Sequence, residues 1–182
     1  MKSHQFATLL AVFTIAVASM SVAQNPMVGG HDMFPQKNII QNAVNSDDHT
    51  TLVAAVKAAG LVDTLEGPGP FTVFAPTNEA FAKLPAGTVD TLLKPENKDQ
   101  LVKTLTYHVV QGRLTSNDLR KMINEGHGTA TLTTIEGGKL EAAMQGSQLV
   151  LKDEKGNIAI VTIPNVMQSN GVIHVVDAVL LP

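Results

Sequence analysis

The chain of 182 residues carries 13 lysines and arginines against 16 aspartates and glutamates, a formal net charge of −3, and it contains no cysteine. This acidic balance argues against a nucleic-acid partner, because the phosphates of a nucleic acid require a basic face. The lack of cysteine excludes disulfides, thiolate nucleophiles and thiolate metal ligands, so a domain of this length must be held together by the burial of its side chains.

The first 23 residues have the order of a secretory signal. Lys2 precedes an apolar run from Phe6 to Ala18, and Ser21-Val22-Ala23 forms a small-x-small cleavage site. The apolar run is shorter than the roughly 20 residues of a membrane-spanning helix, and no later segment approaches that length. We therefore expect cleavage after Ala23 and a secreted, soluble product, either periplasmic or extracellular.

A stretch punctuated by glycine and proline follows the expected cleavage point. From Gln24 to Pro35 the sequence reads QNPMVGGHDMFP, without an apolar periodicity. This composition predicts an extended N-terminal arm, over residues 24–36, that lies outside the core. The regular pattern begins at Lys37, and we expect a single domain over residues 37–182.

Two helices are predicted by apolar residues at helical spacing. Asp47 or Asp48 is expected to cap the first, which ends at Gly60. Pro95 is expected to open the second at its first turn, where the missing N–H has no cost. The apolar faces of the two helices are Leu52, Ala55, Val56 and Ala59, and Leu101, Val102 and Leu105.

Other elements lie between and after these helices. Phe71 to Ala75 is predicted to be a short buried strand, followed by a helix from about Asn78 to Leu84. Further along, Thr115 with Asp118 resembles a capping box for a helix that runs through Ile123.

Short strand-forming runs fill the chain from Thr129 onward. They are separated by Gly137-Gly138, by Gly156-Asn157 and by other turn residues typical of hairpins. Helices in the first half and a strand meander in the second predict an α+β fold rather than the alternating pattern of a nucleotide-binding sheet.

The sequence contains no enzyme signature that we recognise. A G-x-S-x-G elbow, a G-x-x-x-x-G-K-[ST] phosphate loop and an H-E-x-x-H helix are all missing. His49 and His127 are predicted to lie in polar turns, and no two histidines have the spacing of a local metal site. We therefore expect neither an enzyme, nor a metal site, nor a cofactor.

Two histidines lie in apolar runs, His108 in TYHVV and His174 in VIHVV. His174 shares its strand face with Val172 and Val176, and the opposite face is apolar too, so this strand is expected to be internal. A buried imidazole can satisfy backbone groups that would otherwise be left unpaired. We interpret both histidines as structural, with a catalytic or metal-binding pair as the alternative.

Three segments resemble the signature segments of the fasciclin (FAS1) domain family, in the family's order and spacing. They are FTVFAPTNEAF (residues 71–81), TYHVV (106–110) and NGVIHVVDAVLLP (170–182). The resemblance covers one copy from about Lys37 to Pro182 and is greatest to the small secreted single-domain bacterial members, a type that includes mycobacterial secreted antigens. It implies an α+β fold, a FAS1-like β-wedge sheet with several short helices packed at one side. The motif residues expected to be structural are Phe74, Pro76, Thr77, Asn78, Phe81, Asn170, Gly171, His174 and Asp177.

The resemblance also implies a role in adhesion or extracellular contact. In animal members, the Tyr-His segment and an Asp-Ile pair before the last motif are linked to integrin binding. Tyr107 and His108 match the first, whereas Asn165, followed by Val166 and Met167, stands at the second, so the carboxylate is missing. We expect a secreted, non-enzymatic module that contacts a cell-surface or matrix partner, or another copy of itself, through these five residues.

An alternative function is the carriage of an apolar small molecule. Some members of the family bind carotenoids or other apolar ligands in a surface groove. The adaptable side chains of Met122, Met144 and Met167 are candidate linings of such a groove, although apolar side chains more often simply fill the interior.

Overall fold

Seven strands form one bent sheet, with the order β2-β1-β7-β6-β5-β4-β3. The structure is a computed structural model that describes residues 24–182, so the expected signal segment over residues 1–23 lies outside the described residues. The strands are β1 (Phe71–Pro76), β2 (Val109–Gln111), β3 (Thr129–Thr133), β4 (Lys139–Gln145), β5 (Gln148–Lys152), β6 (Ile158–Gln168) and β7 (Gly171–Val176).

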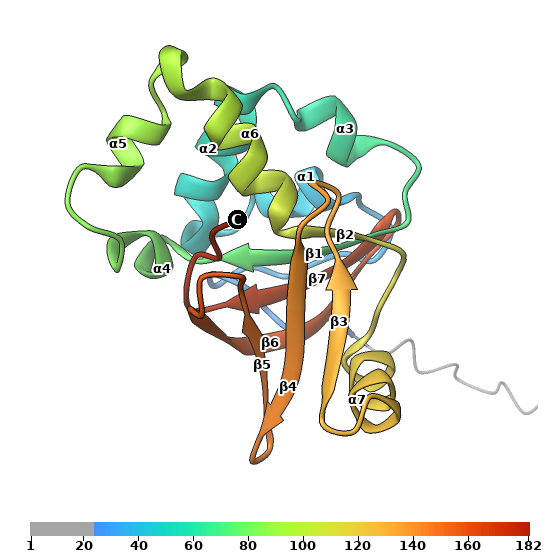
Figure 1. Ribbon diagram of the computed structural model, residues 1–182. Coiled ribbons are helices and arrows are strands. Elements are labelled where there is room, and N and C mark those ends of the chain that lie inside the picture. Colours follow the sequence, from blue (N-terminus) through green and yellow to red (C-terminus); the bar gives the residue numbers. More distant parts are fainter. Residues whose placement is uncertain (1–23) are drawn as a thin grey trace, which may run out of the picture.

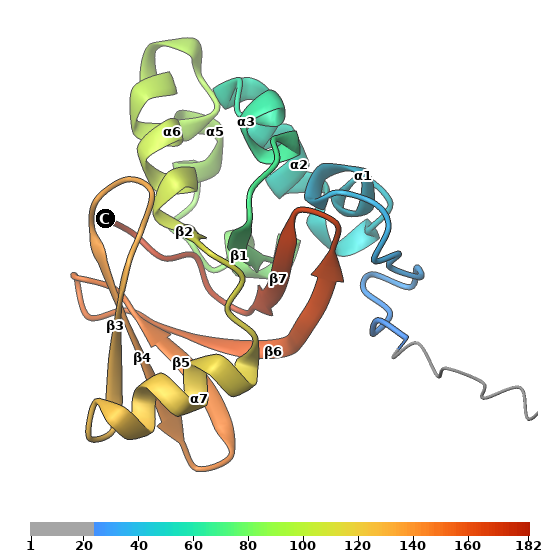
Figure 2. The ribbon, with the colours of Figure 1, turned by 90° about the vertical axis from the view of Figure 1, so that its right-hand side faces the viewer.

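Short helices cover one end of this sheet, and a single helix covers the opposite end. In Figures 1 and 2, α2, α3, α5 and α6 lie together beyond β1, whereas α7 lies beside β3. The helices are α1 (Ile39–Ala43), η1 (Asp47–His49), α2 (Thr50–Ala59), α3 (Val62–Glu66), α4 (Asn78–Ala82), α5 (Thr88–Leu92), η2 (Pro95–Asn97), α6 (Lys98–Tyr107) and α7 (Ser116–Glu125). Within the described part of the chain, every helix is too short or too polar to cross a lipid bilayer.

The central strands β1 and β7 pair in parallel, with Phe74 opposite His174. The other neighbouring strands pair antiparallel. All six residues of β7 are buried, as the apolar character of both its faces predicts. A bridge between Val110 and Thr134, together with a bond from the Ile135 N–H to the Val109 carbonyl (2.8 Å), brings the two ends of the sheet together. The α+β wedge expected from the sequence is therefore confirmed.

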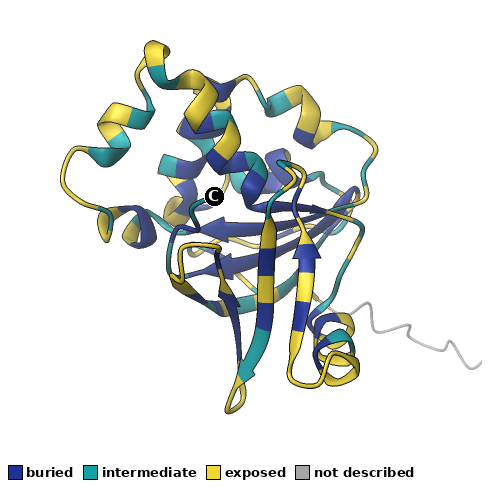
Figure 3. Cartoon of the chain, in the orientation of Figure 1, coloured by how far each residue is buried: buried dark blue, intermediate teal, exposed yellow. Residues whose placement is uncertain are grey.

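The bent sheet separates two apolar cores. The helix-side core lies between the sheet and α1 to α6, and the wedge core lies inside the bend, covered by α7. Along β3 and β4 buried and exposed residues alternate, whereas β1 and β7 are buried almost throughout (Figure 3). The wedge core contains Phe74, Tyr107, Leu119, Leu140, Leu151 and Leu180.

The helix ends agree with the sequence in part. Gly60 ends α2 in the left-handed conformation (φ 73°), and Thr115 with Asp118 forms a complete capping box at the start of α7. The expected caps of α2 are wrong, because Asp47 and Asp48 form the short helix η1 instead and neither makes a capping bond. Pro95 begins η2, and α6 follows from Lys98.

The N-terminal arm (residues 24–36) packs on the domain, which corrects the expectation that it lies outside the core. Val28 and Met33 are buried in the helix-side core. The side-chain amide of Asn25 donates to the carbonyl of Met167 (2.7 Å) and accepts from its N–H (2.9 Å). The arm is irregular in conformation, as expected, but its two buried apolar side chains, the Asn25 amide and the buried Asn42 amide, which binds the backbone of Phe34, fix its position.

We predict that Met33→Ala lowers the free energy of unfolding by about 2–4 kcal/mol, because it removes a buried thioether chain and leaves a cavity. Met27→Ala, in the same arm but at a side chain 58% exposed, is the matched control and should change stability by less than about 0.5 kcal/mol. Chemical denaturation of both variants measures the difference. Equal, negligible effects would show that the arm does not contribute to the core.

Candidate functional site: buried histidines and an apolar cavity

His174 joins three separate segments at the centre of the sheet. Its Nε2–H donates to the carbonyl of Leu114 (2.8 Å), and its Nδ1 accepts from the backbone N–H of Asn165 (3.3 Å). The ring stacks on Phe74, with centroids 5.7 Å apart. Because a carbonyl can only accept and an N–H can only donate, these partners fix the neutral tautomer with the proton on Nε2.

His108 anchors the C-terminal segment in the opposite tautomer. Its Nδ1–H donates to the carbonyl of Thr104 (2.8 Å), and its Nε2 accepts from the N–H of Leu180 (3.0 Å). The next N–H along the chain, that of Leu181, is bound by the carboxylate of Asp153 (2.9 Å). Burial lowers the pKa of His108 to about 4, despite the opposing effects of the Thr104 carbonyl and the Asp153 charge.

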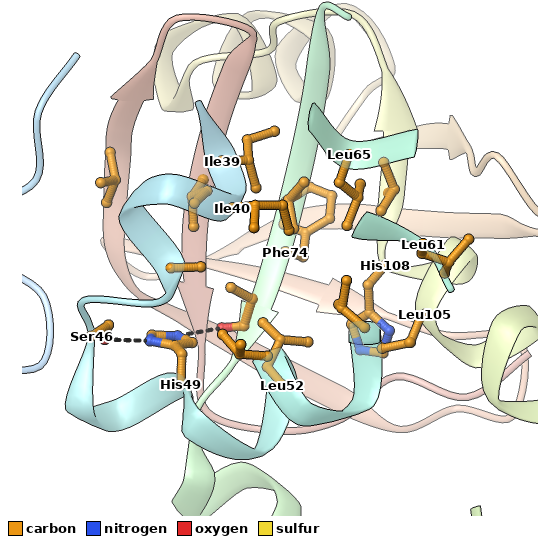
Figure 4. A pocket seen from close by; sticks show the side chains of 18 of the residues that line it. Ile39, Ile40, Ser46, His49, Leu52, Leu61, Leu65, Phe74, Leu105 and His108 are labelled. Carbon is orange, nitrogen blue, oxygen red and sulfur yellow. Dashed lines mark hydrogen bonds between the residues drawn. The ribbon is translucent and has the colours of Figure 1, made fainter. Parts of the chain in front are cut away.

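A third buried histidine, His49, was not expected from the sequence. Its Nδ1 accepts from the hydroxyl of Ser46 (2.8 Å), and its Nε2–H points to the carbonyl of Ala75 at 3.4 Å (Figure 4). The polar neighbours Asp47 and Asp48 indicate a surface turn, but only 3% of His49 is exposed. One feature of the sequence does indicate burial: His49 lies one helical turn before Leu52, where the apolar face of α2 begins.

This arrangement provides structural hydrogen bonds rather than acid–base chemistry. Burial is the main cause that lowers the pKa of His49 and of His174, as it does for His108. For His108 and His174, a second proton would face an N–H group and break a backbone bond. Among residues 24–182, no group of three or more histidine, aspartate or glutamate side chains is placed to hold a metal ion.

The five residues expected to contact a partner are brought close to the core instead. Tyr107 is fully buried, and its hydroxyl donates to the Lys139 carbonyl (2.6 Å) and accepts from the Glu154 N–H (3.2 Å). His108 and Val166 are buried as well. Only Asn165 and Met167 keep partial exposure, so the set as a whole offers little accessible surface in this state.

Asn165, at the position where the resemblance expects aspartate, has a structural role of its own. Its backbone is left-handed (φ 60°), a conformation that asparagine tolerates better than most residues. Its Oδ1 accepts from the N–H of Ser116 (2.7 Å) and its Nδ2 donates to the Ser116 hydroxyl (2.8 Å). One residue thus links β6, the first turn of α7 and, through its N–H, His174.

The first motif positions α2 and α4. Asn78 accepts from the N–H of Thr51 (3.0 Å) and the hydroxyl of Thr50 (3.2 Å), and it donates to the carbonyl of Asp47 (2.9 Å). It is therefore the side chain that caps α2 from a distant part of the chain. Thr77, after Pro76 ends β1, caps α4 by accepting from the Ala80 N–H, and Phe81 is buried behind it.

The last motif closes the helix-side core. The Asn170 side chain accepts from the Ile39 N–H (3.1 Å) and donates to the carbonyls of Leu65 (2.7 Å) and Gly67 (2.9 Å). At Gly171 an added Cβ would meet the Phe71 carbonyl oxygen at 2.1 Å, so only glycine fits there.

Asp177 follows directly after β7 and fastens its end. Its carboxylate accepts from the Ile160 N–H (2.7 Å) and from the ammonium of Lys83 (3.3 Å). The Lys83 ammonium also donates to the Asp177 carbonyl (2.7 Å), so one residue ties β7 to β6 and to the end of α4.

An apolar cavity of about 60 Å³ lies in the helix-side core. Figure 4 shows side chains from α1, α2, α3, α6 and β1 around it, with His49 and His108 at opposite sides. The arm contributes Val28 and Met33 to its wall. The three methionines proposed as groove linings are elsewhere: Met122 and Met144 pack on the wedge core, and Met167 pairs with Asn25.

The buried neutral histidines predict loss of stability in mild acid. The pKa of His108 is lower in the folded chain, at about 4, than its ordinary value of 6.5. The stabilisation it provides is therefore complete above pH 6.5 and is lost as the pH falls toward 4. For His108 alone this loss amounts to about 3 kcal/mol, and His174 adds to it in the same direction.

His108→Gln separates this effect from general acid unfolding. Glutamine keeps one donor and one acceptor but cannot gain a proton, so the variant should be less stable at pH 7.5 yet show a shallower decline between pH 6.5 and 4. His127→Gln, at an exposed histidine, should retain the wild-type profile. Urea denaturation at each pH measures the profiles, and parallel profiles for His108→Gln and the wild type would contradict the assignment.

Comparison with known proteins agrees with the motifs. The family model of the fasciclin domain matches residues 47–182. Protein sll1483 of Synechocystis sp. is 43% identical over 178 residues, which cover 95% of this chain and 89% of that protein. Immunogenic protein MPB70 of Mycobacterium bovis is 37% identical over 77% of this chain and 66% of its own length.

Larger proteins contain the same unit. The transforming growth factor-beta-induced protein ig-h3 of Sus scrofa is 34% identical over 82% of this chain, but the match spans only 20% of that protein. Among solved structures, a FAS1 domain pair from the insect cell adhesion molecule Fasciclin I superposes with a TM-score of 0.71 at 21% identity, over 80% of this chain and 51% of the pair. The chain belongs to the fasciclin (FAS1) domain family.

Proposed function

We propose that this protein is a secreted, non-enzymatic FAS1 module that makes contacts with a cell-surface or matrix partner or with another copy of itself. The observation that carries this proposal is the use of the buried histidines within the fold. His49, His108 and His174 all spend their ring nitrogens on internal hydrogen bonds, and no nucleophile is paired with an accessible base among them. Because these three rings are occupied inside the fold, we infer that the module acts through its surface.

Two further observations support a contact role. The superposable Fasciclin I domain pair comes from a cell adhesion molecule. Three of the five large apolar side chains that are most exposed in the described chain, Met27, Phe34 and Val44, lie in the arm or at the end of α1. Exposed apolar side chains mark a binding surface where they form a contiguous patch, so the contact proposal requires these three to act together. The secretory character of residues 1–23 supports an extracellular or periplasmic location for these contacts.

The alternative, a carrier of a carotenoid or lipid, receives less support. The cavity of about 60 Å³ is smaller than the roughly 150 Å³ that accommodates benzene in an engineered protein core. A carotenoid or an acyl chain is several times larger than benzene. The methionines that were expected to line a groove lie apart from this cavity, so carriage of a long ligand requires a large rearrangement.

Binding and sedimentation assays on a protein of residues 24–182 test the contact proposal. We expect saturable binding to cells or matrix material of the source organism, or concentration-dependent self-association in sedimentation. Binding should fall at least several-fold in Phe34→Ser, which removes an exposed apolar ring. Ile158→Ser is the matched control, because Ile158 is similarly exposed (50% against 45%) at the start of β6, and it should bind like the wild type.

Two results would count against the contact role. A protein that stays monomeric and binds nothing at high concentration would remove the proposal altogether. An equal loss of binding in Phe34→Ser and Ile158→Ser, with unchanged folding, would show that the contacts do not depend specifically on the arm and α1.

A further inference from the structure

The cavity in the helix-side core is lined almost entirely by apolar atoms. Its wall is formed by the arm, by α1 to α3, by α6 and by the central strands, with Ile39, Leu65, Phe74 and Leu105 among the lining side chains (Figure 4). In residues 24–182, every buried side-chain nitrogen and oxygen already has a hydrogen-bond partner. A water molecule needs two to four polar partners, so this cavity is dry.

The histidines in the wall do not change this character. His49 is bound to Ser46 and Ala75, and His108 to Thr104 and Leu180, so no ring nitrogen is left for an occupant. A polar or charged ligand would lose its hydration without gaining a partner. A nonpolar, uncharged molecule would displace no bound water, and it would gain dispersion contacts that the empty space now lacks.

The volume limits the size of the occupant. About 60 Å³ accommodates a single heavy rare-gas atom or a molecule of two or three heavy atoms. Benzene, which occupies a cavity of roughly 150 Å³ in an engineered core, requires the wall to move.

The arm is the part of the wall that has no regular secondary structure. It contributes Val28 and Met33 to the cavity but belongs to no helix or extended strand. Apart from this burial, it is held near its start by the Asn25 amide on Met167 and near its end by the buried Asn42 side chain, which binds the N–H and the carbonyl of Phe34 (3.0 and 2.8 Å). Between these anchors there is a surface contact of His31 with Asp47 (3.4 Å), whose side chains are 50% and 84% exposed. A surface pair of this kind contributes little stability. The other walls are hydrogen-bonded helices and the central strands.

We propose that this cavity is a binding site for a small nonpolar molecule and that the N-terminal arm is the gate through which the molecule enters. The proposal does not depend on the contact function, because it concerns the interior of the domain. The site is distinct from the methionine-lined groove expected from the sequence, since none of those three methionines lines it.

Xenon is the probe for the site itself. In methyl-labelled protein under xenon pressure, we expect saturable NMR shifts at Val28, Ile39 and Leu65, and none in the wedge core. Ala75→Val adds two carbon atoms to the cavity wall, which reduces the free volume, and it should weaken xenon binding at least fivefold. If Ala75→Val does not fold, Val56→Ile, which adds one methylene to the same wall, takes its place in the xenon experiment. Ala142→Val, in the wedge core, is the matched control and should bind xenon like the wild type.

Benzene tests the gate. Asn25→Ala removes both bonds to Met167 and should speed benzene uptake several-fold, as measured by exchange NMR, whereas Gln24→Ala, at the exposed neighbour, should leave the rate unchanged. Equal rates in Asn25→Ala and the wild type would overturn the role of the arm. Absence of a saturable xenon shift in the folded wild-type protein, or equal xenon binding in the wild type and in both wall variants, would overturn the site.

Discussion

The parallel pairing of β1 with β7 is the constraint on which the rest of the structure depends. Both strands are internal to the sheet, flanked by β2 and β6, and are buried almost throughout, so little water reaches the polar groups around them. An unpaired backbone group in such a place costs about 1–3 kcal/mol. The loops and helix ends that pack around this pair must therefore find hydrogen-bond partners inside the protein.

The motif residues supply these partners across long sequence separations. His174 binds a carbonyl 60 residues earlier, and His108 binds an N–H 72 residues later. Asn170 holds α1 and α3, and Asn78 caps α2. Imidazole and amide side chains suit this task because each carries a donor and an acceptor on a short, stiff group. The same chemistry explains why these histidines are unavailable for catalysis.

Much of the fold follows from the sequence, and the parts that do not have physical reasons. The two apolar faces of β7 and the Thr115–Asp118 capping box are local patterns, and both are present as predicted. The packing of the arm was missed because Val28 and Met33 form no periodic pattern and their partners lie far away in the chain. Burial of His49 was hidden by the charged Asp47 and Asp48, which point outward from η1 while His49 points inward.

The candidate site, like the fold, could be predicted from the sequence only in part. Local pattern predicted that His108 and His174 are structural, but it could not reveal that Tyr107 ends a helix with its hydroxyl bound inside the wedge. The cavity is formed by side chains from the arm, several helices and β1 together, so no single segment of the sequence indicates it. Such features arise only when distant segments pack together.

The central claim is that His108 and His174 are neutral hydrogen-bond bridges with opposite tautomers, and nitrogen NMR of the imidazole rings tests it most directly. In the folded protein at pH 7.5, we predict a protonated Nδ1 and a bare Nε2 for His108, and the reverse for His174, with His108 shifts that stay constant down to pH 5.5. Averaged tautomers that titrate near the ordinary histidine pKa of 6.5 would contradict it.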